Sequence, residues 1–320
     1  MSRYRLLPLG VDVGTSRARI AVSERASDGD IRIRAVASRD VAGDVRETPA
    51  LMAALLEEML GELGVRERRA IAALGGSGAA LRIVQFPKMT RHERLRAARF
   101  EAQRFAAPSP GDVSRVVRVH RADDAATRYA VGVATRDAIQ ERTAILKAAK
   151  LKPVALDHDA LALRRLLKDA DAVCDIGAER TALHVYGANA VFSYHLQLGG
   201  AEVTRGIARE LSIDVGSAER RKRILGAAGA GAAVRDAVVG ELAALVERGR
   251  GRAPISRIAL VGNGARLPAL ASELGSATGA LVELIVPALL DCDAYPEDVV
   301  RAAAPDWTLA AALTTWRMIA

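Results

Sequence analysis

Asp12-Val13-Gly14-Thr15 and Asp175-Ile176-Gly177-Ala178 decide the fold, because the same Asp-x-Gly spacing occurs in both halves of the chain. Each tetrapeptide lies between two short runs of apolar residues, which predicts a turn between two strands. Three β-type runs accompany each turn: 7–13, 17–23 and 31–37 in the first half, and 172–176, 181–186 and 190–196 in the second. The chain is therefore predicted to contain an internal duplication of a strand–turn–strand unit.

Segments with helical spacing alternate with further short strands along the chain, which predicts an α/β fold. The predicted helices are 48–63, 90–105, 135–150, 159–167, 201–211, 217–225, 233–248, one from Leu267, and Trp307–Met318; the other strands are 70–74, 81–86, 114–120, 128–134, 153–156, 258–261 and 281–285. We expect residues 1–80, completed by 151–170 and 305–320, to form a first lobe. Residues 171–304 would form a second lobe, and 81–150 an inserted α+β subdomain.

Length and composition exclude several protein classes. The chain has 320 residues, of which 50% are hydrophobic and 26% charged, as expected for a folded protein of about two domains. No apolar run approaches the roughly 18–20 residues of a membrane helix, and no signal peptide is evident. Cys174 and Cys292 have neither metal-ligand nor disulfide spacing, which fits a reducing cytoplasm.

The net charge of +8 admits a nucleic acid or an anionic membrane as partner. The basic clusters 66–69 and 220–223 contain no interleaved aromatic residues on which bases could stack. We therefore interpret the charge as an arginine-coated surface and expect no nucleic-acid partner.

Two Asp-x-Gly turns that face each other across a cleft are suited to hold phosphates and a metal ion. Glycine lets backbone N–H groups approach phosphate oxygens, and hydroxyl groups can donate to the same oxygens. One aspartate from each turn can hold a hydrated Mg²⁺. A single such tetrapeptide is as readily an ordinary turn, so the duplicate carries this prediction. The predicted residues are Asp12 and Asp175 for the metal through water, and Gly14, Thr15, Ser16, Gly177 and Thr181 for the phosphates.

Three other short motifs fit the rest of a nucleotide, and each has a plainer alternative. Gly199 and Gly200 precede a helix whose N-terminal amides would suit a phosphate, or they form a tight turn. A flat base and its ribose could lie against the backbone of the Gly-Asn-Gly segment. The third motif is one helix face that would bind ribose and purine, or would be an exposed ion-pair face. The Gly-Asn-Gly segment consists of Gly262, Asn263 and Gly264. The helix face carries Glu219, Lys222 and Arg223.

Together these features resemble the actin-like ATPase superfamily, which includes sugar kinases, DnaK-type chaperones and FtsA. Residues 86–90, Glu93 and 99–105 resemble the "LPxM…E…EaxxY(I)P" stretch of the type IV pilus assembly PilM family. Asp157 with residues 160–164 resembles the "D…AL.R" helix of that family. The second half of the chain also follows the order and spacing of the family's motifs. The matching positions are Asp175–Gly177, Thr181, Gly199-Gly200, Thr204, Ala218-Glu219, Lys222, Val261–Ala265 and Leu267-Pro268.

The chain also departs from the family pattern. Asn263 stands where glycine is common, and Arg19 stands where a lysine commonly follows the first phosphate turn. Tyr194-His195 occupy the stretch that often carries an arginine before the Gly-Gly turn, and residues 311–313 replace the "GLA" signature. We expect these changes to weaken nucleotide affinity or hydrolysis more than they affect the fold.

The resemblance implies an actin-like, ribonuclease H-like duplicated fold, with two lobes around a cleft for ATP or ADP with Mg²⁺ and an FtsA-type 1C insert. It also implies a cytoplasmic scaffold, peripheral to the inner face of the inner membrane, in a pilus assembly platform with other platform or motor proteins. Its main partner would be the N-terminal tail of a PilN-like bitopic protein, bound in a groove bordered by the insert. The candidate groove residues are Val84, Phe86, Met89, Leu95, Phe100 and Phe105. Some of these must serve the insert's own core.

Two other functions are weighed against the scaffold. A small-molecule kinase would need a general base, for which Asp157 is the candidate, although Asp157-His158-Asp159 also fits a strand end and helix cap. An FtsA-like division or filament protein would carry a C-terminal amphipathic membrane helix, whereas Trp307–Met318 has the composition of a packed helix. Because no activating base is evident, we expect at most slow ATP hydrolysis.

Overall fold

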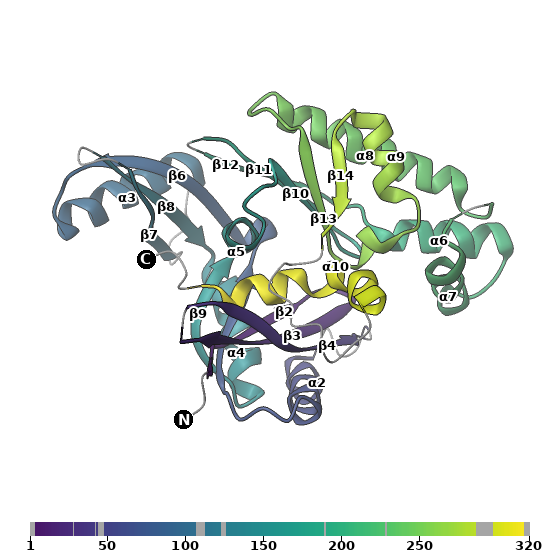
Figure 1. Cartoon of the computed structure of the whole chain (residues 1–320), viewed down its shortest axis with the longest axis horizontal. Coiled ribbons are helices and arrows are strands. Elements are labelled where there is room, and N and C mark those ends of the chain that lie inside the picture. Colours follow the sequence, from purple (N-terminus) through teal and green to yellow (C-terminus); the bar gives the residue numbers. More distant parts are fainter. Residues whose placement is uncertain are drawn as a thin grey trace.

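The computed structural model describes residues 4–27, 29–41, 43, 48–106, 113–122, 126–188, 190–227, 229–285 and 297–316. Three β-sheets organise these residues (Figure 1). The first contains β1 (Tyr4–Leu6), β2 (Leu9–Val13), β3 (Arg17–Ala26), β4 (Ile31–Asp40), β5 (Arg69–Leu74) and β9 (Lys152–His158). The second contains β10 (Ala172–Ile176), β11 (Thr181–Tyr186), β12 (Val191–Leu196), β13 (Arg257–Val261) and β14 (Leu281–Leu284). The third contains β6 (Ala79–Pro87), β7 (Val113–Ala122) and β8 (Ala126–Ala134).

The first two sheets repeat one topology, which confirms the predicted duplication. In the first sheet β3 pairs antiparallel with β2 and β4, while β2, β5 and β9 run parallel. In the second sheet β11 pairs antiparallel with β10 and β12, while β10, β13 and β14 run parallel. Asp12 and Asp175 occupy corresponding places near the ends of β2 and β10, immediately before the first hairpin of each sheet.

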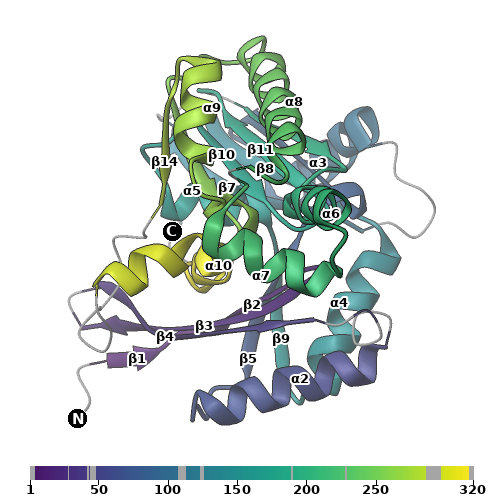
Figure 2. The ribbon, with the colours of Figure 1, turned by 90° about the vertical axis from the view of Figure 1, so that its right-hand side faces the viewer.

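Helices cover both sheets and also fill the space between them (Figures 1 and 2). The outer face of the first sheet is covered by α2 (Pro49–Glu62) and α4 (Arg136–Ala148). The second sheet carries α6 (Gly200–Leu211), α7 (Val215–Leu225), α8 (Ala232–Arg250) and α9 (Leu270–Thr278). Between the sheets lie α5 (Asp159–Leu166) and α10 (Glu297–Thr314), whose apolar residues share a core with β5, β10 and β13. We call the first sheet with α2 and α4 the first lobe, and the second sheet with α6–α9 the second lobe.

The insert consists of the third sheet and α3 (Arg91–Ala106), which packs on it through Phe86, Ala98 and Ala102. The predicted capping box begins α3: Thr90 N–H donates to Glu93 Oε2 at 2.8 Å, and Glu93 N–H donates to Thr90 Oγ1 at 3.3 Å. The expected boundary at residue 150 is too late. The apolar residues of α4, Ile145 and Leu146, belong to the core of the first lobe, so the insert ends at β8.

Two predicted helix starts differ clearly from the structure, and one predicted cap makes no side-chain hydrogen bond. Residues 263–266 form a short 3₁₀ turn and α9 begins only at Leu270, because Pro268 restricts the preceding Leu267 to an extended conformation. The last helix begins at Glu297, before the predicted Trp307, and passes through Pro305. Thr48 precedes α2 as expected, but its side chain makes no capping hydrogen bond. Residues 317 and 318 of the predicted last helix lie outside the described residues. Within the described residues, none of the helices combines the length and apolar character of a membrane span.

The close packing of α10 on β2 depends on a glycine. A Cβ atom at Gly10 would lie 1.8 Å from the carbonyl oxygen of Ala310, far inside van der Waals contact. The carbonyl oxygen belongs to the backbone of a buried helix and the Cβ position is fixed by the backbone of a buried strand, so neither atom can rotate away. The close packing of α10 on the first sheet therefore requires glycine at this position.

We predict that Gly10→Ala lowers the free energy of unfolding by about 2–3 kcal/mol or more, because α10 must move away from β2. Urea unfolding followed by circular dichroism measures this effect. Gly61→Ala and Gly240→Ala are matched controls, since an added Cβ at either helical position meets nothing within 4 Å. Both controls should be neutral or slightly stabilising. Equal stability of Gly10→Ala and the unmodified protein would contradict the packing argument.

Candidate functional site

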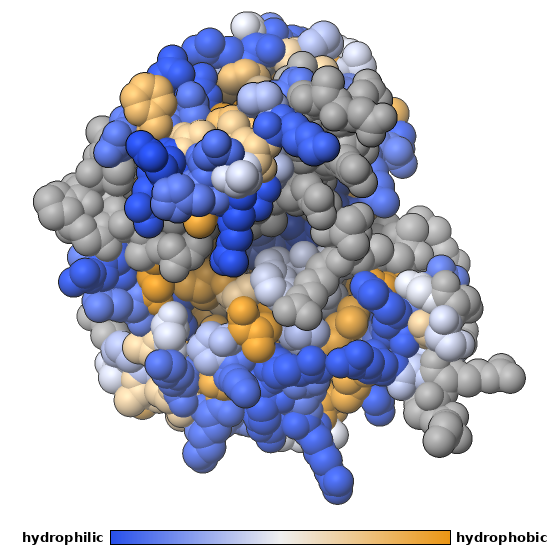
Figure 3. Space-filling view, turned by 90° about the vertical axis from the view of Figure 1, so that its left-hand side faces the viewer, coloured by the Kyte–Doolittle hydropathy of each residue, from blue (hydrophilic) through white to orange (hydrophobic). Residues whose placement is uncertain are grey.

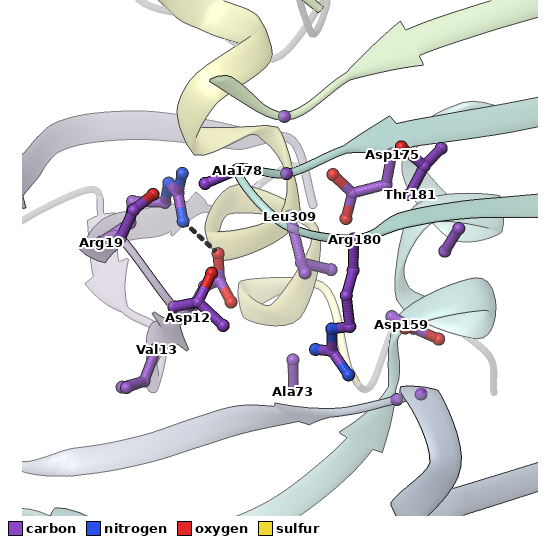
Figure 4. Close-up of a pocket in the computed structure, with 18 of the residues that line it drawn as sticks. Asp12, Val13, Arg19, Ala73, Asp159, Asp175, Ala178, Arg180, Thr181 and Leu309 are labelled. Atoms are coloured by element: carbon purple, nitrogen blue, oxygen red, sulfur yellow. Dashed lines mark hydrogen bonds and ion pairs between the residues drawn. The ribbon is translucent and has the colours of Figure 1, made fainter. Parts of the chain in front are cut away.

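A cavity lies between the two Asp-x-Gly turns (Figure 4). Each turn is closed by the same hydrogen bond: Gly14 N–H donates to Arg17 O at 2.9 Å, and Gly177 N–H donates to Arg180 O at 2.8 Å. The structure thus brings both predicted phosphate turns to one site, although they are remote in the sequence. The lining includes Asp12, Gly14, Thr15, Ser16, Arg19, Asp175, Gly177, Thr181 and Gly262 from the predicted set, together with Gly75, Gly76, Arg142, Asp159, Arg180, His195 and Asp306.

A buried ion-pair network holds the first turn. Arg19 Nη1 lies 3.0 Å from Asp12 Oδ2, and Arg19 Nη2 lies 2.7 Å from Asp306 Oδ1. Ser38 Oγ donates to the other oxygen of Asp306 at 2.7 Å, and Arg17 lies 3.5 Å from that oxygen. Burial alone would lower the pKa of Arg19, but Asp12 and Asp306 raise it above its ordinary value. Burial likewise opposes ionisation of Asp306, yet Arg19 and Arg17 hold its pKa below the usual range. The guanidinium of Arg19 is therefore fixed beside the first turn.

The second turn carries a carboxyl group with a perturbed pKa. Burial, with the nearby Asp12 and then Asp159, raises the pKa of Asp175 to about 7, against a smaller opposing effect of Arg19. Asp159 begins α5 and accepts a hydrogen bond from Ala160 N–H at 2.7 Å. Although burial opposes it, the neighbouring His184 and His158 hold the pKa of Asp159 below its usual range. Asp175 thus faces negative charge that Arg19 and Arg180 offset only in part, which is the environment that a divalent cation relieves.

Some groups expected to bind phosphates are engaged within the protein. The Thr181 hydroxyl donates to Leu198 O at 2.7 Å, so its proton is already used. Gly200 N–H donates to Gly177 O at 3.0 Å, so this amide at the start of α6 is also used. Gly199 has a packing role, because a Cβ there would lie 2.5 Å from Gly177 O. These residues hold the second turn in place, and the structure corrects the expectation that they offer free donors.

A second cavity, beside the second turn, is lined by most of the remaining predicted residues. It is lined by Gly200, Glu219, Lys222, Arg223, Asn263, Gly264, Arg266 and Leu267. Lys222 Nζ lies 2.7 Å from Glu219 Oε2 and donates to Thr204 Oγ1 at 2.7 Å and to Gly200 O at 2.9 Å. Burial opposes ionisation of Glu219, but hydrogen bonds from Lys222 and Thr204 lower its pKa. Glu219 is thus an anionic acceptor at the edge of a partly buried polar pocket.

The Gly-Asn-Gly segment packs directly on the second turn. Gly262 has a φ of +86°, and a Cβ there would lie 2.4 Å from Asp175 Oδ1. A Cβ at Gly264 would lie 2.8 Å from Ile176 O. These two glycines let the second cavity lie immediately beside the turn that carries Asp175.

The candidate groove residues divide into two groups. Phe86 is 7% exposed and belongs to the core of the insert, with Val84, Met89 and Phe105 packed against that core. Phe86 therefore cannot line an open groove, because its side chain faces α3. Leu95 and Phe100 on α3 are 41% and 63% exposed. They are the most exposed of the candidates, whereas Val84, Met89 and Phe105 are half-buried.

Several cavity residues were not predicted from the sequence. Asp306 is remote from both turns in the sequence, and its only signal is an acidic residue in an alanine-rich segment. Asp159 was considered only as a helix cap, and Arg180 and His195 lie in stretches interpreted as strand and turn. Conversely Asp157, the candidate base of a kinase, is buried against Arg165 and is not among the residues that line the cavity.

The raised pKa of Asp175 predicts a pH-dependent stability. In the unfolded chain this carboxyl ionises near pH 3.9. Its stabilising contribution is therefore complete below that pH and is lost as the pH rises through about 7. We compare the free energies of unfolding of Asp175→Asn and the unmodified protein without Mg²⁺ or nucleotide. As the pH rises from 5 to 8, the difference should change in favour of the variant by on the order of 2 kcal/mol. Urea unfolding at both pH values measures this difference, and an equal difference at the two values would refute the assignment.

Comparisons with known proteins agree with the fold and identify the family. The family model for "Type IV pilus assembly protein PilM" matches residues 10–230, and that for "Cell division protein FtsA" matches residues 172–312. No curated protein sequence matches the chain.

Among solved structures, the "PilM-PilN type IV pilus biogenesis complex" is 27% identical, with a TM-score of 0.81 over 97% of this chain and 98% of that chain. The ethanolamine utilization protein EutJ from Carboxydothermus hydrogenoformans is 16% identical, with a TM-score of 0.62 over 97% of this chain and 90% of that one. A glycerol dehydratase reactivase is 10% identical, with a TM-score of 0.56 over 98% of this chain and 100% of that one. The last two show the fold alone, the expected actin-like arrangement of two lobes. Since the PilM model matches more than half of its length, the chain belongs to the type IV pilus assembly protein PilM family.

Proposed function

We propose that this protein is an ATP-binding scaffold of a type IV pilus inner-membrane assembly platform, and that it binds the N-terminal cytoplasmic tail of a PilN-like protein. The observation that carries this proposal is the match to the PilM–PilN complex over almost the whole of both chains. Other platform or motor proteins would assemble around it, and it would lie at the inner face of the inner membrane. The net charge of +8 suits an anionic leaflet.

Two adjoining cavities support nucleotide binding. The Glu219–Lys222 cavity offers polar groups for ribose and base, and the cavity between the turns offers the hydroxyl groups of Thr15 and Ser16 and the guanidinium of Arg19 for phosphates. Gly200 lines the Glu219–Lys222 cavity and packs on Gly177, which lines the cavity between the turns, so the two cavities are contiguous in the fold. A nucleotide with its base in the Glu219–Lys222 cavity and its phosphates in the cavity between the turns would contact both lobes.

Asp12 and Asp175 are the residues that would hold a hydrated Mg²⁺ from opposite lobes. The raised pKa of Asp175 fits this role, because a cation would relieve the crowded negative charge around it. Bound Mg²⁺ would neutralise phosphate charge at this point. Arg19 already pairs with Asp12, so it competes with the metal or shares the phosphates with it.

Neither alternative function is favoured. Asp157 is engaged by Arg165, so it does not reach the cavity as the base of a kinase. The described part of α10 is packed between the two sheets, unlike an exposed membrane-binding helix of the FtsA type. We expect at most slow ATP hydrolysis, with the nucleotide acting mainly through its different affinities for open and closed lobes.

We predict that Asp12→Ala and Asp175→Ala each weaken Mg²⁺-dependent ATP and ADP binding by roughly tenfold or more, because the hydrated metal loses a carboxylate partner. Isothermal titration calorimetry with and without Mg²⁺ measures the affinities. Asp236→Ala, which removes a 65% exposed carboxylate on α8, is the control and should bind as the unmodified protein does. Absence of nucleotide binding by the unmodified protein would refute the proposed cofactor.

The partner proposal concerns the side of the molecule that carries the insert. Figure 3 shows that side, where patches of apolar surface lie among extended polar side chains around a central hollow. Phe100 and Leu95 place exposed apolar groups on α3, where they could anchor an extended tail.

We predict that Phe100→Ser, and to a lesser degree Leu95→Ser, weakens binding of the N-terminal peptide of the adjacent bitopic protein by roughly 5–30-fold. Fluorescence anisotropy of a labelled peptide measures this. Leu51→Ser is the matched control, because Leu51 is similarly exposed, at 43%, on α2. If the control and both insert variants bind the peptide equally, α3 is not part of the groove.

A further inference from the structure

The duplicated turns place an arginine at the same position in each lobe. Arg17 and Arg180 both supply the carbonyl that closes their turn, to Gly14 N–H and Gly177 N–H. Arg17 is committed to acidic partners, since its Nε lies 3.4 Å from Asp40 and 3.5 Å from Asp306. The two arginines thus occupy equivalent backbone positions, and they differ in what their side chains contact.

Arg180 extends across the cavity toward the other lobe. Figure 4 shows its side chain pointing from the second turn toward Ala73 and Asp159. It ends against the turn after β5, where a Cβ at Gly76 would lie 2.5 Å from Arg180 Nη1. The neighbouring Gly75 leaves space for Asp159, because a Cβ atom at Gly75 would lie 1.9 Å from Asp159 Oδ2. Two consecutive glycines of the first lobe therefore make room for these two side chains.

Arg180 is also the cavity arginine without a fixed partner in the described part of the chain. Arg19 is held by Asp12 and Asp306, and Arg142 Nη1 donates to Val13 O at 2.9 Å. The guanidinium of Arg180 makes no hydrogen bond or ion pair with a described residue, and its side chain stays accessible to solvent. A guanidinium in this position is available to an anionic ligand, and its planar fork matches a phosphate group.

We propose that Arg180 binds the terminal phosphate of a nucleoside triphosphate in the cleft, and that it gives the cleft a preference for triphosphate over diphosphate. The inference rests on the proposed nucleotide binding. With the base in the Glu219–Lys222 cavity, the phosphates run between the two turns toward the end lined by Gly75, Gly76 and Asp159. Only the last phosphate reaches that end. Because Arg180 comes from the second lobe and lies against the first, the same contact would hold the lobes together around a triphosphate.

The test compares ATP and ADP affinities, each with Mg²⁺, by isothermal titration calorimetry. Arg180→Ala should weaken ATP binding by roughly 10–100-fold while changing ADP binding by less than about threefold, the loss expected for a charged hydrogen bond. The ATP affinity of Arg180→Lys should lie between those of the unmodified protein and Arg180→Ala, because lysine keeps the positive charge but lacks the planar guanidinium fork. Arg257→Ala is the charge-matched control, since Arg257 begins β13 and pairs with Glu283 at the strand end away from the cavity.

The outcomes separate this inference from the proposed function. Failure of the unmodified protein to bind either nucleotide overturns both. If the unmodified protein binds both nucleotides but Arg180→Ala keeps the same ratio of ATP to ADP affinity, only the role of Arg180 is overturned. An equal loss for ATP and ADP overturns it as well, since the contact would then lie nearer the base. Thermal unfolding of each variant verifies the fold, and Arg180→Lys provides the same comparison if the alanine variant is unstable.

Discussion

The buried guanidinium of Arg19 links the two ends of the chain, and the candidate site depends on that link. Arg19 comes from β3, directly opposite Asp12 in the strand register, and its second partner, Asp306, comes from α10. Leaving a buried charge without its partner typically costs about 3–5 kcal/mol, so this network is far more demanding than the surface ion pairs of the chain. The geometry of the first turn therefore depends on the packing of α10.

The same helix also holds the second lobe. Pro305, one residue before Asp306, accepts a hydrogen bond from Gly262 N–H at 2.7 Å through its carbonyl oxygen. Gly262 in turn lies against the carboxyl group of Asp175. Two consecutive residues of α10 thus contact the Arg19 side and the Asp175 side of the cavity. Under the proposed function, a nucleotide that changed the distance between the turns would act on a helix that contacts both of them.

The sequence was sufficient to predict the duplication, the order of the elements and nine of the 22 residues that line the cavity between the turns. These features follow from local patterns: alternating strands, glycine turns and the repeated Asp-x-Gly spacing. The capping box at Thr90 was predicted for the same reason, because its two partners are three residues apart. The groove candidates on the insert were less predictable, since neither the alternation along β6 nor the helical spacing of α3 tells which face packs in the core of the insert. Phe86 is therefore in the core while Phe100 is exposed.

Features that depend on tertiary contacts could not be read from local pattern. Asp306 and Asp159 reach the cavity only because α10 and α5 lie between the sheets. The Thr181 hydroxyl was expected to bind phosphate, but the approach of Leu198 gives it a backbone acceptor instead. Helix α9 begins at Leu270 and not at Leu267, because Pro268 restricts Leu267 to an extended conformation.

The central claim is that the two duplicated turns form one nucleotide site. A crystal structure of the protein with Mg²⁺ and a non-hydrolysable ATP analogue tests it most directly. The account predicts phosphate density between residues 14–16 and 177–178, with the metal between Asp12 and Asp175 and the base beside Glu219 and Lys222. A nucleotide bound elsewhere on the protein, or no nucleotide at saturating concentration, would contradict it.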